Sequence, residues 1–198
     1  MLGLIGRESD LKLRIVSKPR VSHQHDRVLL RVSDGKDLLG LCRLSFSSSQ
    51  PLEDDEHLYD INRFETMYPR GVVLLEHFFS ESHPDEKQIL EDLVKTAFKL
   101  ALKRNSSVMI IGCRSEVHLQ ILLQLGFRLY IRNSYESEQG FRTPLVLFIQ
   151  DEAHLRLYDS PLLDILMESR LELSKIESRP SPDDLSGTNL SLMSASIG

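Results

Sequence analysis

The sequence has few cysteines, no long apolar run and no excess of positive charge. Its two cysteines, Cys42 and Cys113, are spaced for neither a zinc site nor a redox motif, so we expect buried, reduced thiols. No apolar run approaches the roughly 20 residues that cross a bilayer. The formal net charge of −5 argues against a general nucleic-acid binder. With no secretory signal at the start, these absences predict a cytoplasmic protein.

The familiar catalytic fingerprints are also missing. There is no Gly-x-Ser-x-Gly, P-loop or dinucleotide-binding motif, and no internal repeat. His23 and His25 supply two imidazoles without a third ligand, so no metal site is predicted. A hydrophobic content of 41% over 198 residues fits one globular domain. We assign this domain to residues 1–178 and expect the Ser- and Pro-rich stretch 179–198 to be disordered.

Hydrophobic periodicity predicts the strands. Asp34-Gly35 separates two of them and is typical of a hairpin turn. The run GVVLLEHFF, interrupted only by Glu76, indicates a strand buried on both faces. The predicted strands are 11–16, 27–32, 38–46, 71–79, 108–111, 127–131 and 144–149.

Three helices are predicted, at about 84–104, 116–125 and 161–177. The first has an apolar face made of Ile89, Leu90, Leu93, Val94, Ala97, Phe98 and Ala101. Gly126 takes the place of a left-handed C-cap, which explains why the second helix stops there. Because a helix connects strands 71–79 and 108–111, these two strands run parallel. The order of elements predicts an α/β or α+β fold with a mixed sheet.

Four segments carry a family resemblance. HLQILLQLGFRLY (118–130) is similar to the fourth helix and sixth strand of the GNAT N-acyltransferase superfamily, and GLCRLSF, INRFE and VVLLEHFF resemble its branch of N-acyl amino acid synthases and acyl-homoserine lactone synthases. The resemblance implies a mixed central sheet with a parallel, splayed strand pair and helices on both faces. It also implies acyl transfer from a pantetheine thioester, carried by coenzyme A or by an acyl carrier protein, to a small amine.

The resemblance further implies where the site residues lie. Glu76 occupies the strand in which some relatives keep a catalytic or water-ordering Glu. The alternative is a carboxylate that pairs with an arginine or points to solvent. The donor would bind along the main chain after Glu76 and at the following helix starts. The donor-binding residues implied are Phe78, Phe79, Ser80, Ser82, His83, Lys87 and His118, and a satisfied or exposed histidine is the alternative for the last.

The sequence departs from the family at three places. The phosphate-binding stretch, here SESHPDEKQ, has no glycine and contains acidic residues that repel phosphate. This stretch is therefore expected to bind the phosphates of free coenzyme A poorly, and a carrier-bound donor with one phosphate fits better. Leu122 stands where many relatives have a Tyr general acid, with Tyr130 or Cys113 as possible substitutes. The one or two helices that usually lie between the first strands and border the amine site are also missing, because residues 17–26 are too few to form them.

Lys95, Lys99 and Lys103 recur every four residues on the first predicted helix. Such a stripe would suit an acidic carrier protein, and the alternative is an ordinary solvated helix face. Two functions stay open: an N-acyltransferase, which the predicted splayed strand pair favours, and a non-catalytic binding or regulatory module on the same fold.

Overall fold

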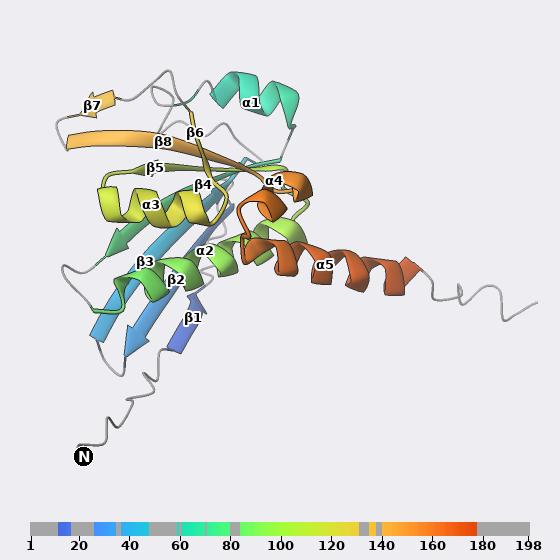
Figure 1. Ribbon diagram of the computed structural model, residues 1–198, viewed down its shortest axis with the longest axis horizontal. Coiled ribbons are helices and arrows are strands. Elements are labelled where there is room, and N and C mark those ends of the chain that lie inside the picture. The colour runs from blue at the N-terminus through green and yellow to red at the C-terminus, as the bar shows by residue number, and fades with distance from the viewer. Residues whose placement is uncertain are drawn as a thin grey trace, which may run out of the picture. The chain divides into compact units, whose positions relative to one another are not determined.

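A computed structural model describes residues 12–16, 26–34, 37–47, 59, 61–69, 71–79, 84–130, 135–137 and 140–177 (Figure 1). By its contacts the chain divides into two units, Met1–Leu166 and Met167–Gly198. The assignment of residues 1–178 to one domain stays a prediction, and residues 179–198 lie outside the described ranges. No helix in the described ranges is long and apolar enough to cross a membrane.

One mixed sheet of eight strands organises the first unit, in the order β1-β2-β3-β4-β5-β8-β6, with β7 paired to β8. The strands are β1 (Lys12–Val16), β2 (Asp26–Asp34), β3 (Asp37–Phe46), β4 (Val72–Phe79), β5 (Val108–Cys113), β6 (Arg128–Leu129), β7 (Tyr135–Ser137) and β8 (Gly140–Phe148). The helices are α1 (Ile61–Met67), α2 (Glu86–Lys103), α3 (Glu116–Gln124), α4 (Glu152–Leu157) and α5 (Leu162–Glu177).

Strands β2 and β3 form the predicted hairpin. They pair antiparallel out to Asp34 and Asp37, so only two residues connect them. The parallel pair is also confirmed, because β4 and β5 run in the same direction with α2 between them in the chain. Every other neighbouring pair in the sheet is antiparallel.

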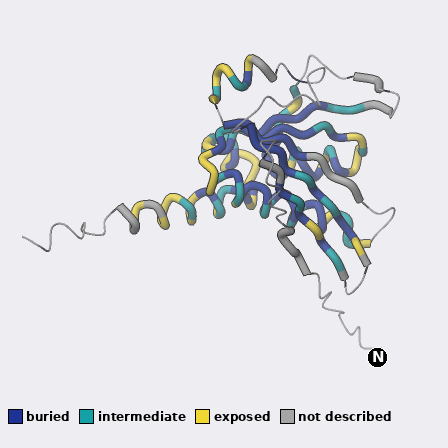
Figure 2. Tube along the Cα trace, turned by 180° about the vertical axis from the view of Figure 1, so that it is seen from behind, coloured by how far each residue is buried: buried dark blue, intermediate teal, exposed yellow. Residues whose placement is uncertain are grey.

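The first halves of the central strands, Val72–Leu75 and Val108–Ile111, are buried on both faces (Figure 2), which agrees with the apolar run in this part of β4. Val73 and Leu75 join a large cluster with the apolar faces of α2 and α3. Val72 and Leu74 join a smaller cluster on the other face. All seven residues predicted for the inner face of α2 are buried. The smaller cluster is Tyr59, Phe64, Val72, Leu74, Val108, Ile110 and Val146.

Helix α1 lies between β3 and β4, where no helix was predicted. It is seven residues long, with no acidic residue in its first turn and no basic residue in its last. A single turn or two without such end signals is hard to find from periodicity. Phe64 holds α1 against the smaller cluster. Helix α4 and strand β7 were likewise not predicted.

The end of α3 has the geometry that the Gly-Phe sequence predicts. Gly126 has φ +99°. Its N–H bonds to the Leu123 carbonyl, and the Phe127 N–H bonds to the Leu122 carbonyl, each at 3.0 Å. These two bonds form a Schellman motif, which satisfies the last carbonyls of the helix. Phe127 is then buried in the core immediately before β6.

Replacing Gly126 by alanine should destabilise the fold. A Cβ at this position would lie 2.9 Å from Cδ2 of the buried Leu155, and the positive φ strains any residue with a side chain. We expect Gly126→Ala to lower the free energy of unfolding by about 1–3 kcal/mol in urea titration. Gln124→Ala, an exposed change in the same helix, should have almost no effect. Equal midpoints for the two variants would contradict this account.

Candidate functional site

Strands β4 and β5 part after four paired residues. Their pairing runs from Val72 with Val108 to Leu75 with Ile111, and no further pairing joins them within the described ranges. Beyond this point β4 stays paired with β3 as far as Phe79, and β5 stays paired with β8 as far as Cys113. The two ribbons diverge accordingly (Figure 1). We call residues 76–79 of β4 and 112–113 of β5 the strand opening. The predicted splayed pair is confirmed.

The hydrogen bonds before the opening show which main-chain groups of β4 face it. The Gly71 carbonyl accepts from the N–H groups of Ser107 and Val108, on the β5 side, at 2.7 and 2.9 Å. The Val72 carbonyl accepts from Ser47, on the β3 side, at 3.0 Å. These directions alternate along a strand, and the register with β3 is unbroken. His77 and Phe79 therefore direct their N–H and C=O groups towards the strand opening.

This alternation refines the predicted donor-binding segment. The main-chain groups of Phe79 face the strand opening, whereas those of Phe78 face β3, where Leu41 is its partner, and the donor-binding role of both residues stays a prediction. Sequence reasoning missed His77, because only the neighbours of β4 reveal which residues face which side. The side chains of these residues, and all of Ser80, Ser82 and His83, lie outside the described parts of the chain.

On β5, Gly112 marks the place where the strand has left β4. It is half-buried, whereas Ile111 before it and Cys113 after it are buried. The Ile111 carbonyl is bound on the β8 side, so the main-chain groups of Gly112 point to the β4 side. Gly112 is therefore partly accessible to solvent at the strand opening.

Glu76, the predicted catalytic residue, is the first residue of β4 in the opening. Its cross-strand partner is Arg43 of β3. Residues directly opposite each other in an antiparallel pair share a face of the sheet. Arg43 is thus the named candidate for the alternative interpretation, a carboxylate paired with an arginine. The Glu76 side chain is not among those described, so its role stays a prediction.

The starts of α2 and α3 meet beside the strand opening. Nε2 of His118 lies 2.5 Å from Oε1 of Glu86, which joins the first turns of the two helices. The His118 side chain is 9% exposed, so the carboxylate supplies the partner that a buried imidazole needs. The Ser115 side chain caps α3 by accepting from the His118 N–H. The predicted donor-binding role of His118 remains untested.

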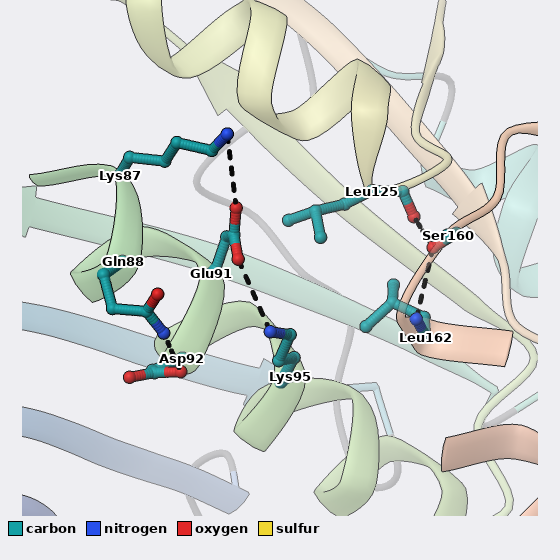
Figure 3. A network of polar contacts seen from close by, with 8 residues as sticks. All are labelled: Lys87, Gln88, Glu91, Asp92, Lys95, Leu125, Ser160 and Leu162. Atoms are coloured by element: carbon teal, nitrogen blue, oxygen red, sulfur yellow. Dashed lines mark hydrogen bonds and ion pairs between the residues drawn. The ribbon is translucent and has the colours of Figure 1, made fainter. Parts of the chain in front are cut away.

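Lys87 is exposed and lies 3.9 Å from Glu91, a carboxylate one turn further along α2. Lys95 approaches the same carboxylate at 3.4 Å, so one glutamate lies between two lysines of this helix (Figure 3). Lys99 and Lys103 are exposed. The lysine stripe predicted as a carrier surface is therefore partly neutralised at Lys95.

Both cysteines are buried free thiols, as predicted. Burial raises the pKa of Cys42 to about 12. Burial also raises the pKa of Cys113, whose thiol donates to the Ser115 carbonyl at 3.2 Å. Since the thiolate is the nucleophile, neither cysteine is activated for covalent catalysis at neutral pH.

Thiol labelling checks this conclusion. In the native protein at pH 7, a thiol-specific reagent should modify Cys42 and Cys113 far more slowly than in denaturant, where both thiols should react. The number of modified thiols is followed by mass spectrometry. A site that reacts equally fast in both states would mean that its thiol is exposed or activated.

Comparisons with known proteins show the fold. No family model matches the sequence, and no curated protein matches it. The solved structure of FeeM, an N-acyl amino acid synthase from uncultured soil microbes, matches at TM-score 0.55 and 14% identity, over 78% of this chain and 96% of that one. The match and the strand order show that the chain has the GNAT fold.

Two acetyltransferase structures match over shorter stretches. The putative acetyltransferase yncA from Salmonella typhimurium, bound to acetyl-CoA, matches at TM-score 0.43 and 14% identity, over 63% of this chain and 66% of that one. The aminoglycoside acetyltransferase AAC(6')-Ib, in complex with coenzyme A, matches at 0.46 and 11% identity, over 66% and 70%. The chain thus spans about two thirds of these two proteins.

Proposed function

We propose that this chain is an acyltransferase that moves an acyl group from a pantetheine thioester to a small amine. The observation that carries the proposal is the strand opening, into which His77 and Phe79 direct main-chain N–H and C=O groups. An extended arm that contains amides can bind such groups as an added strand does. GNAT-fold acyltransferases such as FeeM support the same class of reaction.

Acyl transfer from a thioester to an amine requires few catalytic side chains. The amine nitrogen attacks the thioester carbonyl carbon, the new C–N bond replaces the C–S bond, and the amine loses a proton to a base. A main-chain N–H in the opening stabilises the charge that develops on the carbonyl oxygen. We assign the base to Glu76. A thiol has a pKa near 8.5, so the thiolate can leave without a strong acid, which suits Leu122 at the acid's usual place.

We further propose that the donor is carried by an acyl carrier protein rather than by free coenzyme A. Asp85 and Glu86 place negative charge at the start of α2, where a helix would otherwise attract phosphate. A carrier-bound arm brings one phosphate to this place, whereas coenzyme A brings more. Exposed Lys99 and Lys103, with Lys95 beside them, offer the carrier positive charge.

The cytoplasmic location of the protein remains a prediction.

The second candidate function is a non-catalytic binding module. The Glu86–His118 contact favours it, because the pair occupies the helix starts beside the opening. Leu122, fully buried in the large cluster, provides no acid. A protein of this kind would bind a thioester or a partner without turnover.

A panel of thioesters tests the two functions. We expect thiol release from long-chain acyl-carrier thioesters in the presence of small amines, at a higher kcat/KM than from the matching acyl-coenzyme A. A thermal shift without thiol release would support the binding module. If no thioester is cleaved and none shifts the melting temperature, both the acyltransferase and the thioester-binding proposals fail.

Glu76→Gln tests the proposed base. General-base catalysis contributes about 10²–10⁴-fold, so we expect kcat to fall within this range while the KM for the donor changes little. Glu172→Gln, an exposed change in α5, serves as the control and should leave kcat unchanged. A Glu76→Gln enzyme with full kcat would show that another group or water takes the proton.

A further inference from the structure

Tyr59 makes an unusual set of contacts for a residue in the connection between β3 and α1. Its side chain is completely buried. Its hydroxyl donates to the Ile111 carbonyl of β5. It also accepts from the Leu145 N–H of β8 at 3.0 Å and lies 3.2 Å from the Leu145 carbonyl oxygen. One hydroxyl therefore bonds to two strands that lie 52 and 86 residues further along the chain.

These contacts lie at the row of the sheet where the strand opening begins. Ile111 and Leu145 are cross-strand partners, and Ile111 is also the last residue of β5 that pairs with β4. In a regular antiparallel pair the facing N–H and C=O groups bond to each other directly. The Tyr59 hydroxyl binds a donor on one strand and an acceptor on the other, and so joins β5 to β8 at this row.

The bond to Ile111 also orients the next peptide. In a trans peptide the C=O and the following N–H point in opposite directions. Since the Ile111 carbonyl is held on the β8 side, the Gly112 N–H is held on the β4 side. The Tyr59 hydroxyl thus bonds to β5 at its last residue that pairs with β4.

The ring of Tyr59 links this point to α1. Its centroid lies 5.7 Å from that of Tyr130, which lies 5.4 Å from that of Phe64 in α1. A phenylalanine at position 59 would keep this ring packing. The contribution of the hydroxyl can therefore be tested separately from that of the ring. Burying a hydroxyl costs free energy unless it is hydrogen-bonded.

We propose that Tyr59 is a positioning residue for the acyl donor: its hydroxyl holds the end of β5 against β8 and so keeps the strand opening in the shape that the thioester arm binds. This role rests on the proposed function. It requires no contact between Tyr59 and the substrate, because the hydroxyl lies on the far side of β5 from the opening.

Tyr59→Phe tests the proposal, with Tyr68→Phe as the matched control. Tyr68 packs against the same cluster, with its ring 6.1 Å from that of Phe148. Losing one ordinary hydrogen bond costs up to about tenfold in an equilibrium. We expect Tyr59→Phe to raise the KM for the acyl donor by between about twofold and tenfold, with kcat and the KM for the amine little changed. Tyr68→Phe should leave all three at their wild-type values.

Hydrogen exchange supplies a second readout that does not need turnover. In Tyr59→Phe the amides of Leu145 and Cys113, which face the joint between β5 and β8, should exchange faster, while those of Val108 and Met109 keep their protection. If the donor KM and these exchange rates both match the control, the proposal is overturned and Tyr59 is only a core residue. If the wild type cleaves no thioester but the exchange change is present, the proposed function fails while the hold on β5 stands.

Discussion

A strand inside a sheet can bond on two sides, and the choice of partner along β4 and β5 determines the rest of this structure. Over four residues the two strands are hydrogen-bonded to each other. After Leu75 and Ile111, each keeps only its outer neighbour. Because backbone groups alternate sides, this change of partner leaves every second residue of β4 directed into the opening. The candidate site is thus made of main chain first and side chains second.

This origin explains how much of the protein the sequence predicts. Apolar periodicity locates the strands, the inner face of α2 and the Gly126 stop, because burial and backbone strain act locally and repeat along the chain. The parallel direction of β4 and β5 follows from the intervening helix. The prediction that the two strands part came from the family resemblance and not from periodicity.

The parts that could not be predicted depend on contacts between distant residues. Nothing near Tyr59 in the sequence points to its bonds with Ile111 and Leu145. The contact between His118 and Glu86 arises only when two helix starts are brought together. That the main chain of His77, and not that of Phe78, faces the strand opening depends on which strands flank β4. In each case the sequence shows a suitable residue type but not its partner.

The first half of β4 and of β5 is buried on both faces of the sheet, and this burial fixes the inner end, or floor, of the strand opening. Val72 and Leu74 are packed on one face, and Val73 and Leu75 on the other, so the paired rows cannot separate without exposing two cores. With about 3.3 Å per residue, the four residues of β4 beyond this floor extend roughly 13 Å along the opening. An arm that enters along the strands must stop there. Whatever it carries at its tip has to turn out of the plane of the sheet, and this turn would present a reactive group to the sheet surface rather than bury it deeper.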